Sequence, residues 1–176
     1  MTGDLDSTRL LQATHRLRRW RVRTGLLLAV AVLAGCRGKP ATFRDEGKGA
    51  AELRAMLADA DHEVQARGAF GLSRLGADAR DAVPELIPLL KSPASLARQN
   101  AALALGAIGP DAGAAIPALT EALKDAEWTV RRQAAQALGA IGPAAKPALP
   151  ALKKLDADPQ KPVRDAAKQA REKIGG

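Results

Sequence analysis

The sequence predicts an all-α solenoid, that is, a stack of helical hairpins repeated every 33 residues. The first observation is the register, because from about residue 49 onward the same residue types return at this spacing without an insertion. The second is that every copy closes on a glycine, at Gly76, Gly109, Gly142 and Gly175. A fixed period of this length is typical of repeat proteins, in which one unit buries its apolar face only against its neighbours. About four units fit into residues 49–176.

The stretch from Ile116 to Pro143 shows how one unit is expected to fold. Pro117 opens it, and proline suits the first turn of a helix because its missing N–H would have no partner there. Two leucines four residues apart then share one face of the first helix. After an acidic turn, apolar residues at spacings of four, four and three predict the second helix. Gly142 and Pro143 end it, since glycine can adopt the left-handed cap and proline cannot continue a helix.

Four features of this unit resemble a known repeat family. They are the opening Ile116-Pro117-Ala118-Leu119, the aspartate turn, the pair Val130-Arg131 and the closing stretch Ala137 to Pro143. In these features the chain resembles the HEAT family, and specifically the short HEAT-like repeats that are also found in phycobilisome lyases. The resemblance covers roughly residues 49–176. It implies the fold strongly and the function only weakly.

The resemblance also implies a structural ladder between adjacent units. In the family, the turn aspartate and the arginine of the Val-Arg pair tend to bridge neighbouring repeats. The equivalent residues here are Asp59, Asp125 and Asp158, with Arg98, Arg131 and Arg164. Gln65 and Ser92 depart from this pattern, so we expect an incomplete ladder at the N-terminal end.

The last unit differs from the others on one face. Lys168 occupies a position where the preceding units have alanine, and Arg171 occupies one where they have leucine. Terminal repeats need a polar outer face for solubility. The final helix, roughly Gln160 to Lys173, is therefore expected to cap the stack.

Residues 1–36 read as an export leader. Arginines between residues 16 and 23 precede a short apolar run at residues 26–33, which is typical of a secretory signal peptide. The run ends in Leu33-Ala34-Gly35-Cys36, which resembles the lipobox of bacterial lipoproteins. The resemblance implies a signal peptide over residues 1–35 and a lipid on Cys36. The Gly, Pro and mixed charges that follow, without an apolar period, predict a flexible tether through residue 48. The repeat domain, residues 49–176, would then be anchored to a bacterial envelope membrane, facing the periplasm or the exterior.

Two alternatives for the leader stay open. One is an uncleaved N-terminal anchor in which Cys36 is a plain buried thiol. The other is a twin-arginine signal at Arg18-Arg19, which the following Trp20-Arg21-Val22 fits poorly. Asp4 and Asp6 are unusual in a signal peptide, which leaves a start further downstream open as well.

The remaining composition offers few groups for chemistry. Half of the net charge of +8 lies in residues 1–36, where six arginines face two aspartates, so the rest is only mildly basic and gives no reason to expect nucleic-acid binding. His62 is the only histidine after the leader, and Cys36 is the only cysteine, so no His/Cys metal set can be assembled. Deoxyhypusine hydroxylase, a HEAT-like enzyme, binds two irons through His-Glu pairs inside its second helices. His62-Glu63 instead begins a helix, and we expect no metal, cofactor or catalysis.

The second helices of HEAT stacks line the concave side, which is an extended binding surface. Trp128 is the sharpest candidate there, since its equivalents in the other units are polar and interface hot spots are enriched in Trp and Arg. The alternatives are that Trp128 folds over a neighbouring turn and that the strip is only a solvated face. The other positions that the core pattern leaves free are Arg67, Arg74, Gln99, Asn100, Arg132, Gln133 and Gln136.

These observations favour a monomeric, lipid-anchored scaffold that binds protein partners without catalysis. Two other functions stay open. One is a chaperone or lyase-like protein that binds a tetrapyrrole or another small molecule. The other is a structural accessory subunit of an envelope complex.

Overall fold

The computed structural model describes residues 49–175, and all regular structure in this range is helical. Four hairpins follow one another along the chain, each with a first and a second α-helix, and 3₁₀ segments precede or follow several of the first helices. The hairpins are α2 (Ala50–Leu57) with α3 (His62–Leu75), α4 (Val83–Leu89) with α5 (Ser95–Ile108), α6 (Ile116–Ala122) with α7 (Trp128–Ile141), and α8 (Leu149–Lys154) with α9 (Lys161–Ile174). The 3₁₀ segments are η1 (Gly76–Ala82), η2 (Gly109–Ala115), η3 (Gly142–Ala148) and η4 (Leu155–Ala157). This architecture confirms the predicted α-solenoid.

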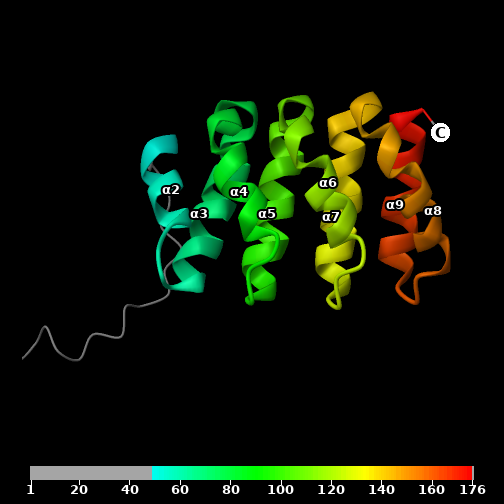
Figure 1. Ribbon diagram of the computed structural model, residues 1–176, viewed down its shortest axis with the longest axis horizontal. Helices are drawn as coiled ribbons and strands as arrows, with labels where there is room; N and C mark the ends of the chain where they lie inside the picture. Colours follow the sequence, from blue (N-terminus) through cyan, green and yellow to red (C-terminus); the bar gives the residue numbers. More distant parts are fainter. Residues whose placement is uncertain (1–48, 176) are drawn as a thin grey trace, which may run out of the picture. The chain divides into compact units, whose positions relative to one another are not determined.

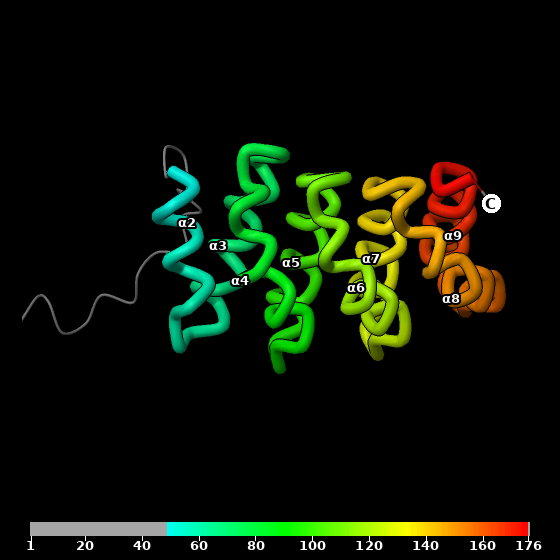
Figure 2. Tube along the Cα trace, turned by 45° about the horizontal axis from the view of Figure 1, so that its top comes forward, coloured from blue at the N-terminus to red at the C-terminus, as the bar shows by residue number. Residues whose placement is uncertain are grey.

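The hairpins stand side by side in chain order, as Figures 1 and 2 show. Each second helix packs extensively against the second helix of the next hairpin, whereas successive first helices make few contacts. The second helices therefore form one face of the stack, which we call the inner face, and the first helices form the opposite, outer face.

Glycines allow this close packing of second helices. A Cβ added to Gly139 in α7 would lie 2.8 Å from the Cα of Ala170 in α9. The equivalent distance from Gly106 in α5 to the Cα of Ala137 in α7 is 3.1 Å. Both values are shorter than an ordinary carbon–carbon contact of about 3.5–4.0 Å. The missing side chains thus let the two backbones meet.

The core consists of leucine, alanine and smaller numbers of valine and isoleucine, in the predicted register. Leu53, Leu86, Leu119 and Leu152 on the first helices are each at most 1% exposed, and so are Leu72, Leu105 and Leu138 on the second helices. The stretch Ser95–Ala122 is apolar and long enough, by length and composition, to be considered as a membrane span. It comprises α5, η2 and α6, and 44% of its apolar window is buried inside the stack. That burial is typical of core helices, which pass the same test.

The connections between hairpins differ from the sequence prediction. Gly76, Gly109 and Gly142 have φ of 58°, 74° and 79° with ψ of −131°, −133° and −142°, so they do not form the expected left-handed helical cap. They adopt an extended conformation with positive φ that is essentially restricted to glycine. The chain then continues as a 3₁₀ segment that buries two of its alanines, which are Ala112 and Ala115 in η2. Gly175 alone adopts the left-handed cap in this part of the chain.

Helix α9 (Lys161–Ile174) has the extent and the polar outer face that the sequence predicts for the final helix. Lys168 is exposed, and Arg171 forms an ion pair with Asp156, in which Nη1 lies 2.6 Å from Oδ2. The apolar residues of α9 face back toward α7.

Candidate binding surface

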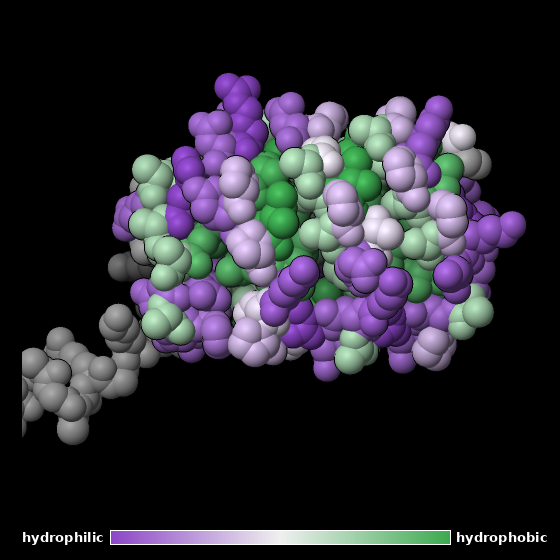
Figure 3. Space-filling model, in the orientation of Figure 1, coloured by the Kyte–Doolittle hydropathy of each residue, from purple (hydrophilic) through white to green (hydrophobic). Residues whose placement is uncertain are grey.

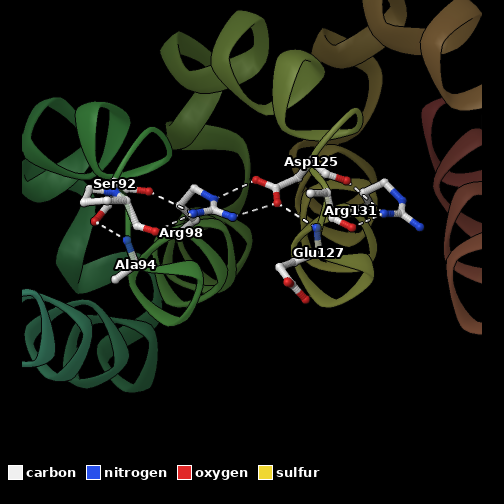
Figure 4. Close-up of polar contacts among 8 residues, drawn as sticks. Ser92, Ala94, Arg98, Asp125, Glu127 and Arg131 are labelled. Atoms are coloured by element: carbon white, nitrogen blue, oxygen red, sulfur yellow. Dashed lines mark hydrogen bonds and ion pairs between the residues drawn. The ribbon is translucent and has the colours of Figure 1, made fainter.

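The turns between first and second helices carry the predicted ladder (Figure 4). Arg98 in α5 donates from Nε and Nη2 to the carboxylate of Asp125, one unit further along, over 2.7 and 2.8 Å. Arg131 in α7 pairs with Asp158 in the same way, over 2.7 and 3.1 Å. In each arginine, Nη1 also donates to two carbonyl oxygens of its own turn. One guanidinium therefore fixes its own turn and the next unit together.

The aspartates of the ladder are held as carboxylates. Each accepts a backbone N–H two residues ahead, from Glu127 to Asp125 and from Gln160 to Asp158. The hydrogen bond from Arg131 lowers the pKa of Asp158, against the opposing effect of burial. Burial would raise the pKa of Asp125, but the hydrogen bonds from Arg98 and the Glu127 N–H outweigh it, so this pKa is lowered too.

The ladder is interrupted between the first and second units, as the sequence predicts. Gln65 donates from Nε2 to the carbonyl oxygen of Asp59 over 2.7 Å. This hydrogen bond replaces the contact of a ladder arginine with its own turn, but not its contact with the next unit. Ser92 accepts the N–H of Ala94 at 3.4 Å. The carboxylate of Asp59 accepts the N–H of Asp61, and it pairs with no arginine among residues 49–175.

The sequence analysis did not find the contact that joins these two units instead. Arg54 in α2 forms an ion pair with Glu85 in α4, on the outer face. At the other end, Arg164 donates to the carbonyl oxygens of Asp158 and Pro159, and no carboxylate in residues 49–175 pairs with it.

Trp128 lies at the start of α7, on the edge of the inner face. It is half-buried and packs partly against the core. The guanidinium carbon of Arg132, one turn later, lies 5.3 Å from the centroid of its ring, within the range of a cation–π interaction. The Nε of Arg132 is buried and has no hydrogen-bond partner in the part of the chain that the structure describes.

The structure divides the other predicted surface residues into two groups. Gln136 is exposed, and Gln99 and Arg67 are half-buried. Asn100 and Gln133 are each only 7% exposed, which corrects the expectation that the core pattern leaves them free. Asn100 donates from Nδ2 to the carbonyl oxygen of Ala66 in the preceding second helix, over 2.9 Å. Its amide therefore helps to stack the units.

Two hollows lie on the inner face, one between α5 and α7 and the other between α7 and α9. The first has a volume of about 180 Å³ and the second about 190 Å³. Gln136 lines both of them. The first is walled mainly by apolar side chains and the second mainly by polar ones. Figure 3, which has the orientation of Figure 1, shows apolar residues in short stripes that polar residues interrupt.

Groups for chemistry are sparse in the described residues. His62 is exposed, and its Nδ1 lies 3.1 Å from Oε1 of Gln65. No three His, Cys, Asp or Glu side chains between residues 49 and 175 are grouped in a way that could hold a metal ion. Cys36, the leader over residues 1–35 and the tether through residue 48 lie outside the described range.

A model of HEAT repeats matches residues 50–115 and 110–171, which together make up most of the chain. The chain belongs to the HEAT-repeat family. No curated protein matches it in sequence. The repeat units that the model matches coincide with the stacked hairpins described above.

Solved structures with this fold include both enzymes and binding proteins. The complex of CpcE and CpcF of phycocyanin lyase from Nostoc sp. PCC7120 is 25% identical, with a TM-score of 0.61 over 80% of this chain and 58% of that one. Human deoxyhypusine hydroxylase is 29% identical, with a TM-score of 0.56 over 74% and 44%. Computationally designed armadillo repeat proteins for modular peptide recognition are 25% identical, with a TM-score of 0.60 over 70% and 63%. This HEAT-repeat chain thus spans less than two thirds of each.

Proposed function

We propose that this HEAT-repeat protein is a non-catalytic scaffold that binds a protein partner on the inner face of its second helices. The observation that carries the proposal is the pair Trp128 and Arg132, a half-buried aromatic ring under a guanidinium, on the same helix as Gln136, which lines two hollows. Tryptophan and arginine dominate the binding energy of many interfaces. Designed armadillo repeat proteins of similar fold serve modular peptide recognition, which supports a binding function here.

The test is to replace Trp128 with alanine and compare captured partners. The native host supplies the membranes, and bound proteins are identified after cross-linking and mass spectrometry. Because Trp128 is only half-buried, the variant should keep the helical circular dichroism of the parent and lose its specific partners. Exposed Leu96, at the start of α5, offers a matched control when it is changed to alanine. An unchanged partner set with Trp128→Ala contradicts the proposed anchor.

We further propose that the protein is anchored to a bacterial envelope membrane by lipid on Cys36. The support is the sequence alone: a basic flank, a short apolar run and Leu33-Ala34-Gly35-Cys36 at its end. Acyl chains contribute about 0.8 kcal/mol of binding free energy per buried CH₂, so two or three chains hold a protein on a membrane stably. Mass spectrometry of protein from the native host should show a new N-terminus at Cys36 with added acyl mass. An intact leader with an unmodified thiol contradicts the anchor.

A lyase-like or chaperone function for a tetrapyrrole is the second candidate. The similarity to the phycocyanin lyase complex, which covers 80% of this chain, favours it. Protein purified from its host should then carry visible absorbance from a bound chromophore. A colourless protein that does not take up bilin in titration argues for the scaffold instead.

A further inference from the structure

The last turns of the second helices form one row across the inner face. Arg74, Ala107, Ala140 and Lys173 occupy equivalent positions in α3, α5, α7 and α9, and all four are exposed. A cation therefore stands at each end of the row, with two alanines between them. We call these four residues the terminal row.

A hollow that can accept one aliphatic side chain lies in the centre of this row. It is bounded by Ala107 and Ala140 of the terminal row, by Leu103 and by Gly106. Next along the stack, the second hollow has Gln169 and Lys173 in its wall. The surface thus offers an apolar centre and a polar, cationic flank.

The charges of this face favour an anionic occupant. Asp165, the carboxylate on the α9 side of the face, is paired with Lys161, whose Nζ lies 2.6 Å from its Oδ2. Asp78, just beyond Arg74, and Glu172, beside Lys173, are exposed at the two ends. Within residues 49–175, Arg74, Arg132 and Lys173 form no ion pair with any of these carboxylates.

The spacing sets the length of the occupant. Packed helix axes lie about 8–10 Å apart, so three units separate Arg74 from Lys173 by roughly 24–30 Å. An extended chain advances about 3.3 Å per residue, so about three residues cross one unit. Ten extended residues would therefore reach from one cation to the other, with the fifth or sixth above the apolar hollow.

We propose that the terminal row binds an extended acidic peptide segment of about ten residues, with a carboxylate near each end and an aliphatic side chain in the middle. This inference rests on the proposed function, since it names the chemistry of the partner segment at the same inner face. The carboxylates pair with Arg74 and Lys173, and the aliphatic side chain fills the hollow over Gly106. Backbone groups of the peptide lie within reach of Gln136, the exposed amide that lines both hollows.

Fluorescence anisotropy with synthetic peptides tests this inference on the purified full chain. The probe is a terminally blocked ten-residue peptide with glutamate at positions 1 and 10, valine at 5 and 6, and serine elsewhere. One comparison peptide has lysine at both ends, and another has both glutamates moved to the centre. The glutamate-ended peptide should bind more tightly than either, and its affinity should fall as salt rises because exposed charges are screened.

Two protein variants and their controls locate the site. Lys173→Glu should weaken the glutamate-ended peptide by about threefold to tenfold, as expected for reversing one exposed ion pair, and Lys153→Glu on the outer helix α8 should not. Ala140→Phe should abolish binding by filling the hollow, while Ala114→Phe in η2 should not. All four positions are exposed, so the variants are expected to keep the parent's helical circular dichroism.

The outcomes separate this inference from the proposed function. Equal binding of the lysine-ended peptide, or insensitivity to Lys173→Glu and Ala140→Phe, overturns the acidic-peptide inference. Absence of binding by every peptide also overturns it, and if Trp128→Ala still removes the native partner, the scaffold proposal stands without it. If Trp128→Ala keeps the native partner, and Lys173→Glu and Ala140→Phe keep the peptide, both proposals are overturned.

Discussion

Replacing Asp158 with alanine should destabilise the stack because it removes one complete rung of the ladder. The Arg131 side chain is 13% exposed and that of Asp158 only 4%. After the substitution, the guanidinium of Arg131 stays largely buried with its Nε and Nη2 facing no carboxylate. The N–H of Gln160 also loses its acceptor.

The expected loss in the free energy of unfolding is about 2.5–4 kcal/mol. Breaking a buried ion pair by removing one partner typically costs about 3–5 kcal/mol. Two carbonyl oxygens still accept hydrogen bonds from Nη1 of Arg131. The loss caused by its unpaired guanidinium therefore lies at or just below the lower end of this range, at about 2–3 kcal/mol. Loss of the acceptor for one backbone N–H adds about 0.5–1 kcal/mol.

Asp59 provides a matched control, since it occupies the same position in the first unit. Its carboxylate accepts a backbone N–H two residues ahead, as that of Asp158 does, but no arginine in the described part of the chain pairs with it. Asp59→Ala should therefore cost only about 0.5–1 kcal/mol. Urea unfolding of both variants, followed by circular dichroism at neutral pH, measures the difference directly.

The comparison refutes the reasoning if Asp158→Ala and Asp59→Ala lose the same stability within experimental error. In that case the buried rung contributes no more than an exposed turn. A double-mutant cycle with Arg131→Met gives the coupling energy of the pair without the contribution of the turn. We expect a coupling of about 2 kcal/mol.

Three further predictions concern the same stack. Gly139→Ala should destabilise the protein by about 1–2 kcal/mol in urea unfolding, because its Cβ would meet the Ala170 backbone, whereas Gly113→Ala, with open space around it, should be neutral or slightly stabilising. The pKa of Asp125 is lowered in the folded protein, so its carboxylate contributes stability above the unfolded pKa of about 4, and this contribution is lost as pH falls through the folded pKa. In an acid titration of stability, the Asp125→Asn variant should therefore show a shallower loss than the parent. Gln65→Arg combined with Ser92→Asp should install the missing rung and exceed the sum of the single changes by about 1 kcal/mol, and an additive result would contradict it.

The repeat register allowed much of the fold to be predicted from the sequence. Leucines at equivalent positions proved to be core residues because each unit faces the same neighbours. The same argument located the rungs from Arg98 to Asp125 and from Arg131 to Asp158. Arg164 has no carboxylate partner in the described residues for a related reason: each arginine reaches forward, so its aspartate would come from a following unit.

Other features could not be predicted because they depend on geometry between units. Asn100 and Gln133 look like surface residues by polarity, yet both are buried, and Asn100 donates to a backbone carbonyl oxygen of the neighbouring hairpin. The ion pair between Arg54 and Glu85 occurs at only one interface, so a search for repeated residue types does not reveal it. The ψ angle of Gly109, which directs the chain into a 3₁₀ segment, also cannot be predicted from the presence of a glycine alone.

The forward direction of the rungs has a consequence for how such a chain can lengthen. Because Arg98 contacts the unit after its own and Asp125 the unit before, the hairpin of α6 and α7, with Asp125 and Arg131, carries both halves of the connection. An in-frame duplication of 33 residues between them would restore all of these contacts at the new junction, whereas a slip of one residue would misplace every one. Duplication by whole units is therefore the change that this molecule can absorb most easily during evolution.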